Sequence, residues 1–350
     1  MEKIIIYQVF TRLFGNDNAA CHTDGDYATN GCGKMADFTA KALDEIKKLG
    51  ATHIWYTGII EHATQNDYSS YGIKRDHPAV VKGKAGSAYA IKDYYDVDPD
   101  LAENVEDRIK EFKALVKRSH RAGLKVIIDF VPNHIARNYS DRNGGLPHCG
   151  YCDADWTDTF KLDYSNPGLY ARLLSILKYW ASFGVDGFRC DMVELVPAEA
   201  LGILLRRIKA FRQDICFIAE VYDTGNYRRY LDAAGFDYLY DKSGSYDILR
   251  GILCDGRPAW DLTSNWQRLG PDQDRMVNFL ENHDEQRIAS EWFCGSAHKA
   301  MAALAFSALF NNAAWMIYFG QEVGEDAKEG YLGRTSIFEW CSPERTGRLY

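Results

Sequence analysis

An amphipathic helix that ends at a glycine and leads into a short apolar strand recurs along this chain of 350 residues. In the first such unit Phe38, Ala42 and Ile46 share one helical face, Asp37 stands where a helix cap is expected, and Gly50 ends the pattern. Later helices are expected at residues 105–123, 169–184 and 197–212. Strands that alternate with helices pair in parallel through right-handed crossovers, so the chain is expected to be an α/β protein.

Eight strands can be counted. They are expected at residues 4–10, 52–58, 124–129, 187–191, 216–220, 236–240, 276–280 and 316–319. Eight parallel units close a barrel more naturally than they extend an open sheet. No G-x-G-x-x-G segment follows a strand, so the alternative of a nucleotide-binding sheet lacks its phosphate cradle. The sequence therefore predicts a (β/α)8 TIM barrel that occupies residues 1–350.

Two long connections interrupt the pattern. Residues 134–165, after the third strand, are rich in Asn, Asp, Gly and Cys and are expected to form a short inserted subdomain or lid. Residues 61–100 form a second long connection after the second strand. Both connections follow the carboxyl ends of strands, where barrels carry their functional loops.

The chain ends at Tyr350 without a convincing eighth helix, so either the barrel lacks its last helix or the chain is truncated.

Charge and hydropathy bear on the class of partner. The net charge of -8 argues against a nucleic-acid or anionic-membrane partner, because both favour a basic face. The N-terminal apolar run is too short for a secretory signal, and the longest apolar stretch, residues 300–310, is too short to span a bilayer. We therefore expect a soluble, cytoplasmic protein.

The nine cysteines lack the spacing of a disulfide framework, and buried free thiols are the expectation. Cys149 and Cys152 form a lone C-x-x-C pair beside His148. A zinc site needs four ligands, of which only these are local, so ordinary loop cysteines are favoured over zinc.

Carboxylates stand at the ends of several apolar strand segments: Asp129, Asp191, Glu220 and, slightly beyond, Asp284. The carboxyl ends of barrel strands meet on one face, so these side chains should share a pocket. Arg189 precedes Asp191 by two residues and lies on the same side of the strand, where it is expected to hold Asp191 ionised. Glu220 follows an apolar segment, a setting that suits a general acid.

A pair of such carboxylates is what the cleavage of a glycosidic bond requires. One protonates the leaving oxygen and the other meets the oxocarbenium-like centre. His134 and His283 each stand next to an asparagine near a strand end, from which they could donate hydrogen bonds to sugar hydroxyls. The residues thus favour a glycoside hydrolase.

At this point the chain resembles the α-amylase family of glycoside hydrolases (family 13), from residue 7 to residue 322. Four segments carry the resemblance: 129–134 (DFVPNH), 187–191 (GFRCD), 220–222 (EVY) and 282–284 (NHD). Tyr89 is similar to the tyrosine that stacks on the sugar in this family. The four segments occur in the family's order, each at its expected strand.

The resemblance implies a role for each residue. Asp191 would be the nucleophile and Glu220 the acid/base, with Asp284 as the stabiliser of the transition state. The substrate-binding residues would be Tyr89, His134, Arg189 and His283. Configuration would be retained, which predicts the two working carboxyl groups about 5–5.5 Å apart. The implied substrates are α-linked glucans such as starch, glycogen and malto-oligosaccharides.

Several departures from the family are visible. Glu194 and Leu195 replace a Lys-His pair that often follows the nucleophile and helps to hold calcium. Asn133 is the one oxygen ligand found for such an ion, so no cofactor is expected to be required and calcium is only an option. The family's usual C-terminal β-sandwich is also absent, and the exposed barrel surface predicts low stability or self-association.

Other functions remain open. An α-glucosyl transferase or isomerase of the family would use the same three carboxylates. A non-catalytic barrel that serves as a binding module is disfavoured because all three carboxylates are present. A metal-dependent hydrolase built on His148, Cys149 and Cys152 is disfavoured further.

Overall fold

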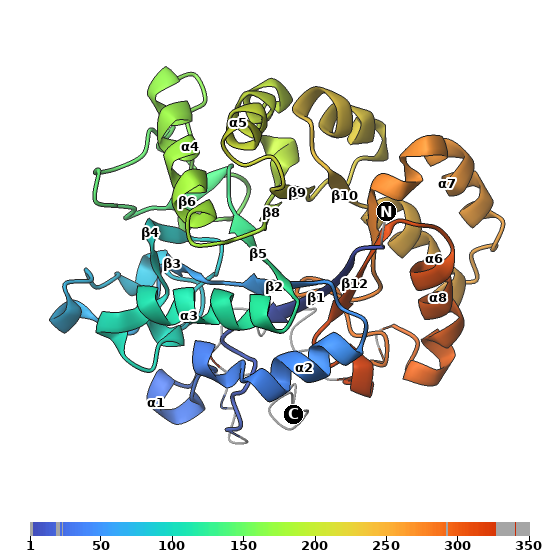
Figure 1. Ribbon diagram of the computed structural model, residues 1–350, viewed down its shortest axis with the longest axis horizontal. Coiled ribbons are helices and arrows are strands. Elements are labelled where there is room, and N and C mark those ends of the chain that lie inside the picture. Colours follow the sequence, from blue (N-terminus) through green and yellow to red (C-terminus); the bar gives the residue numbers. More distant parts are fainter. Residues whose placement is uncertain (1–2, 19–21, 23, 292, 327–339, 341–350) are drawn as a thin grey trace.

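The computed structural model describes residues 3–18, 22, 24–291, 293–326 and 340. Eight parallel strands close into a barrel in the spatial order β1-β12-β11-β10-β9-β8-β5-β2, with β1 also paired to β2 (Figure 1). The barrel strands are β1 (Ile5–Phe10), β2 (His53–Thr57), β5 (Lys125–Phe130), β8 (Gly187–Cys190), β9 (Cys216–Ala219), β10 (Tyr238–Tyr240), β11 (Met276–Asn278) and β12 (Ala314–Tyr318). All eight predicted strands are present, and the predicted TIM barrel is confirmed.

Helices surround the strands in Figure 1. They are α1 (Tyr27–Asn30), α2 (Ala40–Lys48), α3 (Arg108–Arg121), α4 (Pro167–Ala181), α5 (Ala198–Phe211), α6 (Asp247–Cys254), α7 (Asp261–Leu269) and α8 (Ala297–Leu309). Two π-helical turns, at Arg229–Ala234 and Lys242–Tyr246, flank β10. The four helices predicted from apolar periodicity correspond to α2, α3, α4 and α5.

The start of α2 differs from the prediction. Its cap is Thr39, whose hydroxyl accepts a hydrogen bond from the backbone N–H of Ala42 at 3.1 Å. Asp37 lies two residues earlier, where its carboxylate accepts from the N–H of Lys34 at 2.6 Å and closes a short 3-10 turn. The prediction that Asp37 caps this helix is therefore wrong. Both Asp37 and Thr39 can accept a hydrogen bond from a backbone N–H, and the carboxylate of Asp37 is already used by the 3-10 turn, so Thr39 caps α2.

The barrel interior is apolar near the amino ends of the strands. Ile6, Ile127, Ile218, Val277 and Met316 belong to one buried cluster, contributed by five different strands. A second, larger cluster lies between the strands and the helices. Because side chains alternate along a strand, the next inward positions toward the carboxyl ends can carry polar groups. The apolar layer thus forms the floor beneath the site.

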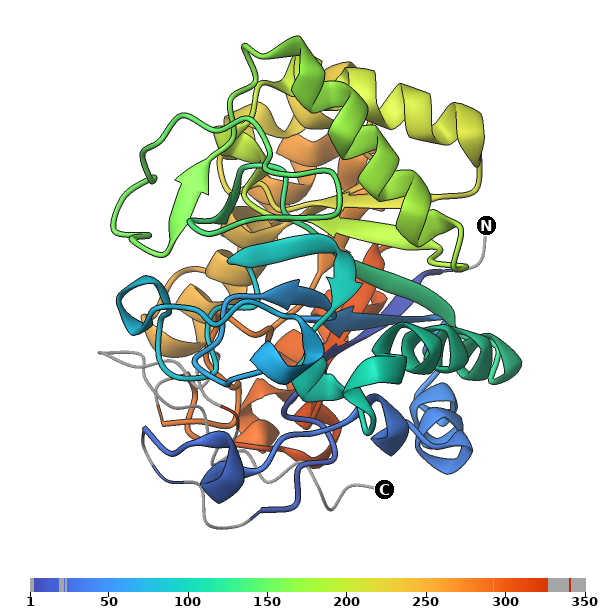
Figure 2. The same cartoon turned by 90° about the vertical axis from the view of Figure 1, so that its left-hand side faces the viewer.

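Two small antiparallel sheets lie outside the barrel. β3 (Ile60–His62) pairs with β4 (Ile91–Val97), and β6 (His134–Ala136) pairs with β7 (Thr159–Lys161). They belong to the two long connections, and they lie side by side at one end of the barrel (Figure 2). Residues 134–165 thus fold around one two-stranded sheet that packs against the loop after β2.

After β12 the described chain holds one short 3-10 turn, at Gln321–Val323. The predicted lack of a last helix and of a β-sandwich concerns residues that lie, apart from residue 340, outside the described part. Within the described residues, no helix is long and apolar enough to cross a membrane.

Candidate active site

The strand-end carboxylates meet at the carboxyl end of the barrel. In the strand register Asp129 lies opposite Arg189, and Cys190 lies opposite Ala219, so Asp191 and Glu220 follow at neighbouring positions. An open pocket of about 650 Å³ lies above them. Six of the seven predicted catalytic and substrate-binding residues line it: Tyr89, His134, Asp191, Glu220, His283 and Asp284. The seventh, Arg189, is fully buried.

Arg189 joins the carboxylates from below. Its Nη1 donates to Asp191 Oδ1 at 2.6 Å, and its Nη2 lies 2.7 Å from Glu220 Oε1. Asp129 Oδ1 is 3.7 Å from Nη1. One guanidinium therefore neutralises part of the charge of three acids that converge from three strands, of which the sequence spacing predicted only the contact with Asp191.

The protonation of Asp191 differs from the expectation. Burial and the neighbouring Glu220 carboxylate raise the pKa of Asp191, and Arg189, which lowers it, offsets only part of this rise. The expectation that Arg189 holds Asp191 ionised is therefore wrong in its net direction. Removing a carboxyl group from water disfavours its charged form, and a second carboxylate nearby adds to this effect.

Glu220 receives two donors that the sequence analysis did not identify. The backbone N–H of Met192 donates to Oε2 at 2.8 Å, and the hydroxyl of Tyr222 donates to Oε1 at 2.7 Å. Met192 adopts a left-handed conformation with φ of 43°. This backbone region is costly for a residue other than glycine, and it typically persists where surrounding contacts enforce it.

Tyr89, His283 and Asp284 form one wall of the pocket. The amide of Gln8 donates to His283 Nδ1 at 2.7 Å, so the hydrogen of a neutral ring lies on Nε2. That nitrogen is 2.5 Å from the Tyr89 hydroxyl and 3.2 Å from Asp284 Oδ2. The Asp284 side chain is 37% exposed and is thus open to a ligand, unlike the buried histidine.

Asp129 supports this wall from the barrel interior. Its Oδ2 accepts from the indole N–H of Trp55 at 3.0 Å, and its Oδ1 lies 3.5 Å from the Tyr89 hydroxyl. Burial raises the pKa of Asp129 to about 7. Trp55 and Gln8 stand at inward strand positions, a signal that could have identified them beforehand.

His134, the first residue of β6, also lines the pocket. Its ring packs against Trp156 with centroids 5.2 Å apart. Burial lowers the pKa of His134 to about 4, so the imidazole is neutral at ordinary pH. Next to it, Asn133 Nδ2 donates to Asp153 Oδ2 at 2.8 Å, and Lys161 Nζ donates to Asp153 Oδ1 at 2.9 Å.

A buried arginine supports the loop that carries Tyr89. Arg12 Nη2 donates to the carbonyl of Gly86 at 2.8 Å, and Nη1 donates to the carbonyl of Ala85 at 3.2 Å. Gly86 has a φ of +82°, and a Cβ there would lie 1.7 Å from the carbonyl oxygen of Ala63. The loop therefore follows the neighbouring backbone too closely to admit a side chain at this point.

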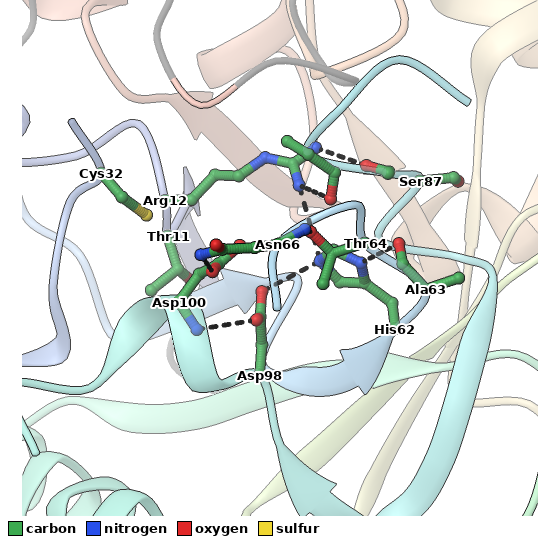
Figure 3. A network of polar contacts seen from close by, with 12 residues as sticks. Thr11, Arg12, Cys32, His62, Ala63, Thr64, Asn66, Ser87, Asp98 and Asp100 are labelled. Atoms are coloured by element: carbon green, nitrogen blue, oxygen red, sulfur yellow. Dashed lines mark hydrogen bonds and ion pairs between the residues drawn. The ribbon is translucent and has the colours of Figure 1, made fainter. Parts of the chain in front are cut away.

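Arg12 itself belongs to a buried polar network, shown in Figure 3. His62 Nε2 lies 3.5 Å from Arg12 Nη1 and 2.9 Å from Asp98 Oδ2, and its Nδ1 lies 3.0 Å from the carbonyl of Ala63. Both ring nitrogens of His62 thus face oxygen acceptors. This network connects the end of β1 to the segment that leads to Tyr89, which the sequence analysis did not foresee.

The loop that holds the C-x-x-C pair packs its histidine on an aromatic ring. Cys149 and Cys152 are free thiols, and the His148 ring stacks on Phe160. Within the described residues, no group of three or more side chains of the metal-binding types gathers.

Comparisons with known proteins point in one direction. The family described as "Alpha amylase, catalytic domain" matches residues 8–144 and 150–337. Alpha-amylase 2 of Dictyoglomus thermophilum is 23% identical over 346 residues, which cover 92% of this chain and 55% of the relative. A cyclomaltodextrin glucanotransferase of Geobacillus stearothermophilus is 24% identical over 375 residues, with 91% and 49% covered. The chain spans about half the length of these curated relatives.

A solved structure shows the same fold. The crystal structure of an alpha-amylase from Lactobacillus plantarum superposes with a TM-score of 0.72 at 25% identity, and the alignment covers 96% of this chain and 75% of that one.

Proposed function

Because this chain belongs to the α-amylase family, whose members are glycoside hydrolases acting on α-glucans, we propose that it cleaves α-linked glucans with retention of configuration. The substrates would be starch, glycogen and malto-oligosaccharides. The observation that carries the proposal is the buried Arg189, which bridges Asp191 and Glu220 beneath an open pocket. A retaining glycosidase needs two carboxyl groups in this relation, with one proton between them.

In the first step Asp191 attacks the anomeric carbon while Glu220 protonates the leaving oxygen. For this step Glu220 has to carry the proton, and Asp191 has to be the free carboxylate. The Tyr222 hydroxyl, 2.7 Å from Glu220, can accept as well as donate, so it supports either protonation state of Glu220. Arg189 then stabilises the Asp191 carboxylate.

The wall of Tyr89, His283 and Asp284 would hold the sugar at the cleavage point. The Tyr89 ring offers a face for the sugar, and Asp284 is exposed enough to accept from ring hydroxyls. His134, neutral because its pKa is about 4, serves as a hydrogen-bond partner and not as a cation. Contacts to the sugar that strengthen as the sugar ring flattens in the transition state would lower the activation barrier.

In the second step Glu220 activates the acceptor that attacks the glycosyl-enzyme. Water gives hydrolysis, and a sugar hydroxyl gives transfer. Transfer is the second candidate, because one of the relatives is a cyclomaltodextrin glucanotransferase. Product analysis with and without added maltose distinguishes the two, because transfer yields chains longer than the substrate.

Calcium has a poor set of ligands here. Asn133 Oδ1 is buried and has no hydrogen-bond partner among the described residues, so this oxygen could face a cation. The adjacent carboxylate of Asp153, however, already pairs with the ammonium of Lys161 at 2.9 Å. Calcium takes six to eight oxygens, several of them anionic. The residues beside Asn133 do not fit the ion, and the proposed mechanism uses none.

The test is release of reducing sugar from soluble starch and maltoheptaose. The Asp191→Asn variant should lose activity by at least about 10³-fold, because the nucleophile is removed. Asp44→Asn, an exposed change on α2, is the matched control and should retain activity. A folded parent that binds maltoheptaose but releases no sugar would instead support a binding module, and an active Asp191→Asn would overturn the assignment of the nucleophile.

A further inference from the structure

A second groove lies behind the catalytic pocket, between the loop after β3 and the β6–β7 sheet. It encloses about 810 Å³ of open space, and its lining includes Lys74, Arg75, His77, Arg137, Asn138 and Phe160. Thr159 and Phe160 are consecutive on β7, so their side chains face opposite sides. Thr159 lines the catalytic pocket and Phe160 lines this groove. The two cavities are therefore separated by one strand.

The groove is basic on a protein of net charge -8. No acidic side chain stands among the described residues that line it. Two carboxylates of the adjoining loop have partners: Asp76 is buried and lies 3.1 Å from Lys92 Nζ, and Asp67 accepts from the N–H of Ser69 and pairs with Arg75, itself a lining residue, at 3.6 Å. The positive charge of Lys74 and Arg137 is thus left without a carboxylate among the ion pairs of the described residues.

Arg137 is held in place before any ligand arrives. Its guanidinium lies 4.9 Å from the centroid of the Phe160 ring, and Nη1 donates to the carbonyl of Thr157 at 3.3 Å. His148 stacks on the same ring at 4.8 Å and 5°. A guanidinium that is stacked and hydrogen-bonded loses little freedom on binding, and its remaining N–H groups can take two oxygens of one anion.

His77 adds a directed donor. The backbone N–H of Ala79 donates to His77 Nδ1 at 3.2 Å, so the hydrogen of the neutral ring lies on Nε2. The side chain is exposed at the edge of the groove. Lysine, arginine and histidine donors without a competing carboxylate are the set that binds a compact anion with several acceptor oxygens.

We propose that this groove binds a phosphate group, either free or as the monoester of a sugar. Phosphate matches the fork of Arg137 with two oxygens and leaves others for Lys74 and His77. The volume suits a ligand of the size of a sugar phosphate, and it is far too small for a nucleic-acid duplex. This site is distinct from the catalytic pocket and does not depend on the proposed cleavage.

The experiment is calorimetric titration of the whole protein at low ionic strength with inorganic phosphate, glucose 6-phosphate and glucose. The variants are Arg137→Gln, which removes the charge, and Phe160→Leu, which removes the ring that orients it. Arg121→Gln, an exposed charge at the end of α3, is the matched control. We expect Arg137→Gln to weaken phosphate binding at least about tenfold and Phe160→Leu less, while Arg121→Gln binds as the parent does.

Comparing the two phosphate compounds shows whether the ligand is free phosphate or a sugar monoester. Glucose 6-phosphate bound at least about tenfold more tightly than inorganic phosphate identifies a sugar monoester as the ligand, and equal affinity identifies the phosphate group alone. Glucose should compete with neither. The proposal is overturned if no phosphate compound binds, if Arg137→Gln binds as tightly as the parent, or if Arg121→Gln weakens binding as much as Arg137→Gln does.

Discussion

At the scale of single residues, the site depends on a few buried polar side chains behind the ones that would touch a substrate. Gln8 sets the tautomer of His283, Trp55 donates to Asp129, and Met192 donates its backbone N–H to Glu220. None of these side chains has to react. Each orients a side chain that would take part in the reaction, so a small displacement of the supporting group can reduce activity strongly.

Arg12 offers a test of this support. Arg12→Met keeps most of the buried stem but leaves the carbonyls of Ala85 and Gly86 without their donor, so the loop that carries Tyr89 should shift. We expect kcat/KM on maltoheptaose to fall at least about tenfold, mainly through a higher KM, and Arg12→Lys to recover part of it. Steady-state kinetics on variants with a native circular dichroism spectrum would check this. Unchanged kinetics in folded Arg12→Met would contradict it.

The neutral state of His134 predicts a dependence of stability on pH. Its pKa is about 4 in the folded protein and about 6.5 in an unfolded chain. Between these values the unfolded chain binds more protons, so this histidine's contribution to stability is complete above pH ~6.5 and is lost as the pH falls toward ~4. Urea unfolding at several pH values should show the parent losing stability relative to His134→Gln over that window. A constant difference would contradict the burial of a neutral ring.

At the scale of elements, the small β6–β7 sheet is attached to the barrel through charge as well as packing. Lys161 on β7 pairs with Asp153, and Asp153 accepts from Asn133 just beyond β5. An ammonium that belongs to the chain thus stands where a bound cation could otherwise join these segments. We therefore predict that the stability of this segment does not depend on the metal content of the solution.

Metal removal tests that arrangement. The thermal midpoint of the parent should be the same in EDTA and in calcium. Lys161→Ala should lower the midpoint. We expect it to reduce the free energy of unfolding by about 1–2 kcal/mol, because Asp153 is left with one hydrogen-bond donor fewer. Lys209→Ala, which breaks a comparable pair with Asp237 between α5 and β10, is the matched control. A parent whose midpoint falls in EDTA would show that a metal ion stabilises it after all.

Four helices that the sequence analysis did not name (α1, α6, α7 and α8) and the two π-helical turns distinguish the observed elements from the expected ones. α6 and α7 lie between β10 and β11, where the sequence analysis identified no specific helix. α6 follows directly on a π-helical turn, and α7 contains the polar segment of Thr263, Ser264 and Asn265. Such short helices lack the three or four repeats of an apolar stripe that make a periodicity readable.

At the scale of the whole molecule, apolar side chains gather on the outside of α7 and α8. The exposed members are Trp260, Trp266, Met301, Leu309 and Phe310. Leu309 is 80% exposed. Exposed apolar side chains that gather in this way mark a surface that associates with a partner. The expectation of self-association thus gains a specific location.

Sedimentation over a range of protein concentrations would test it. The parent should associate as its concentration rises, and the double variant Leu309→Gln with Phe310→Gln should shift toward the monomer, because it removes apolar area from the surface. Phe211→Gln, an exposed aromatic on α5, is the control and should behave as the parent does. A parent that stays monomeric throughout would contradict the expectation.

The sequence by itself determined the barrel and the composition of its site. Periodic apolar residues specify helices and strands locally, and strand ends of a parallel barrel converge by geometry, so Asp191, Glu220 and Asp284 could be placed in one pocket without coordinates. Asp37 marks the limit of this reasoning, because Thr39 two residues later was an equally suitable cap.

Only the tertiary structure decided what surrounds these residues. The contact of Arg12 with Gly86 and that of Gln8 with His283 join residues 74 and 275 positions apart. No local period records such a contact. The net pKa direction of Asp191 likewise depends on burial and on Glu220 from another strand. Local periodicity depends on residues that are close in the sequence. Burial and the interaction between charges, in contrast, arise only when distant segments pack together.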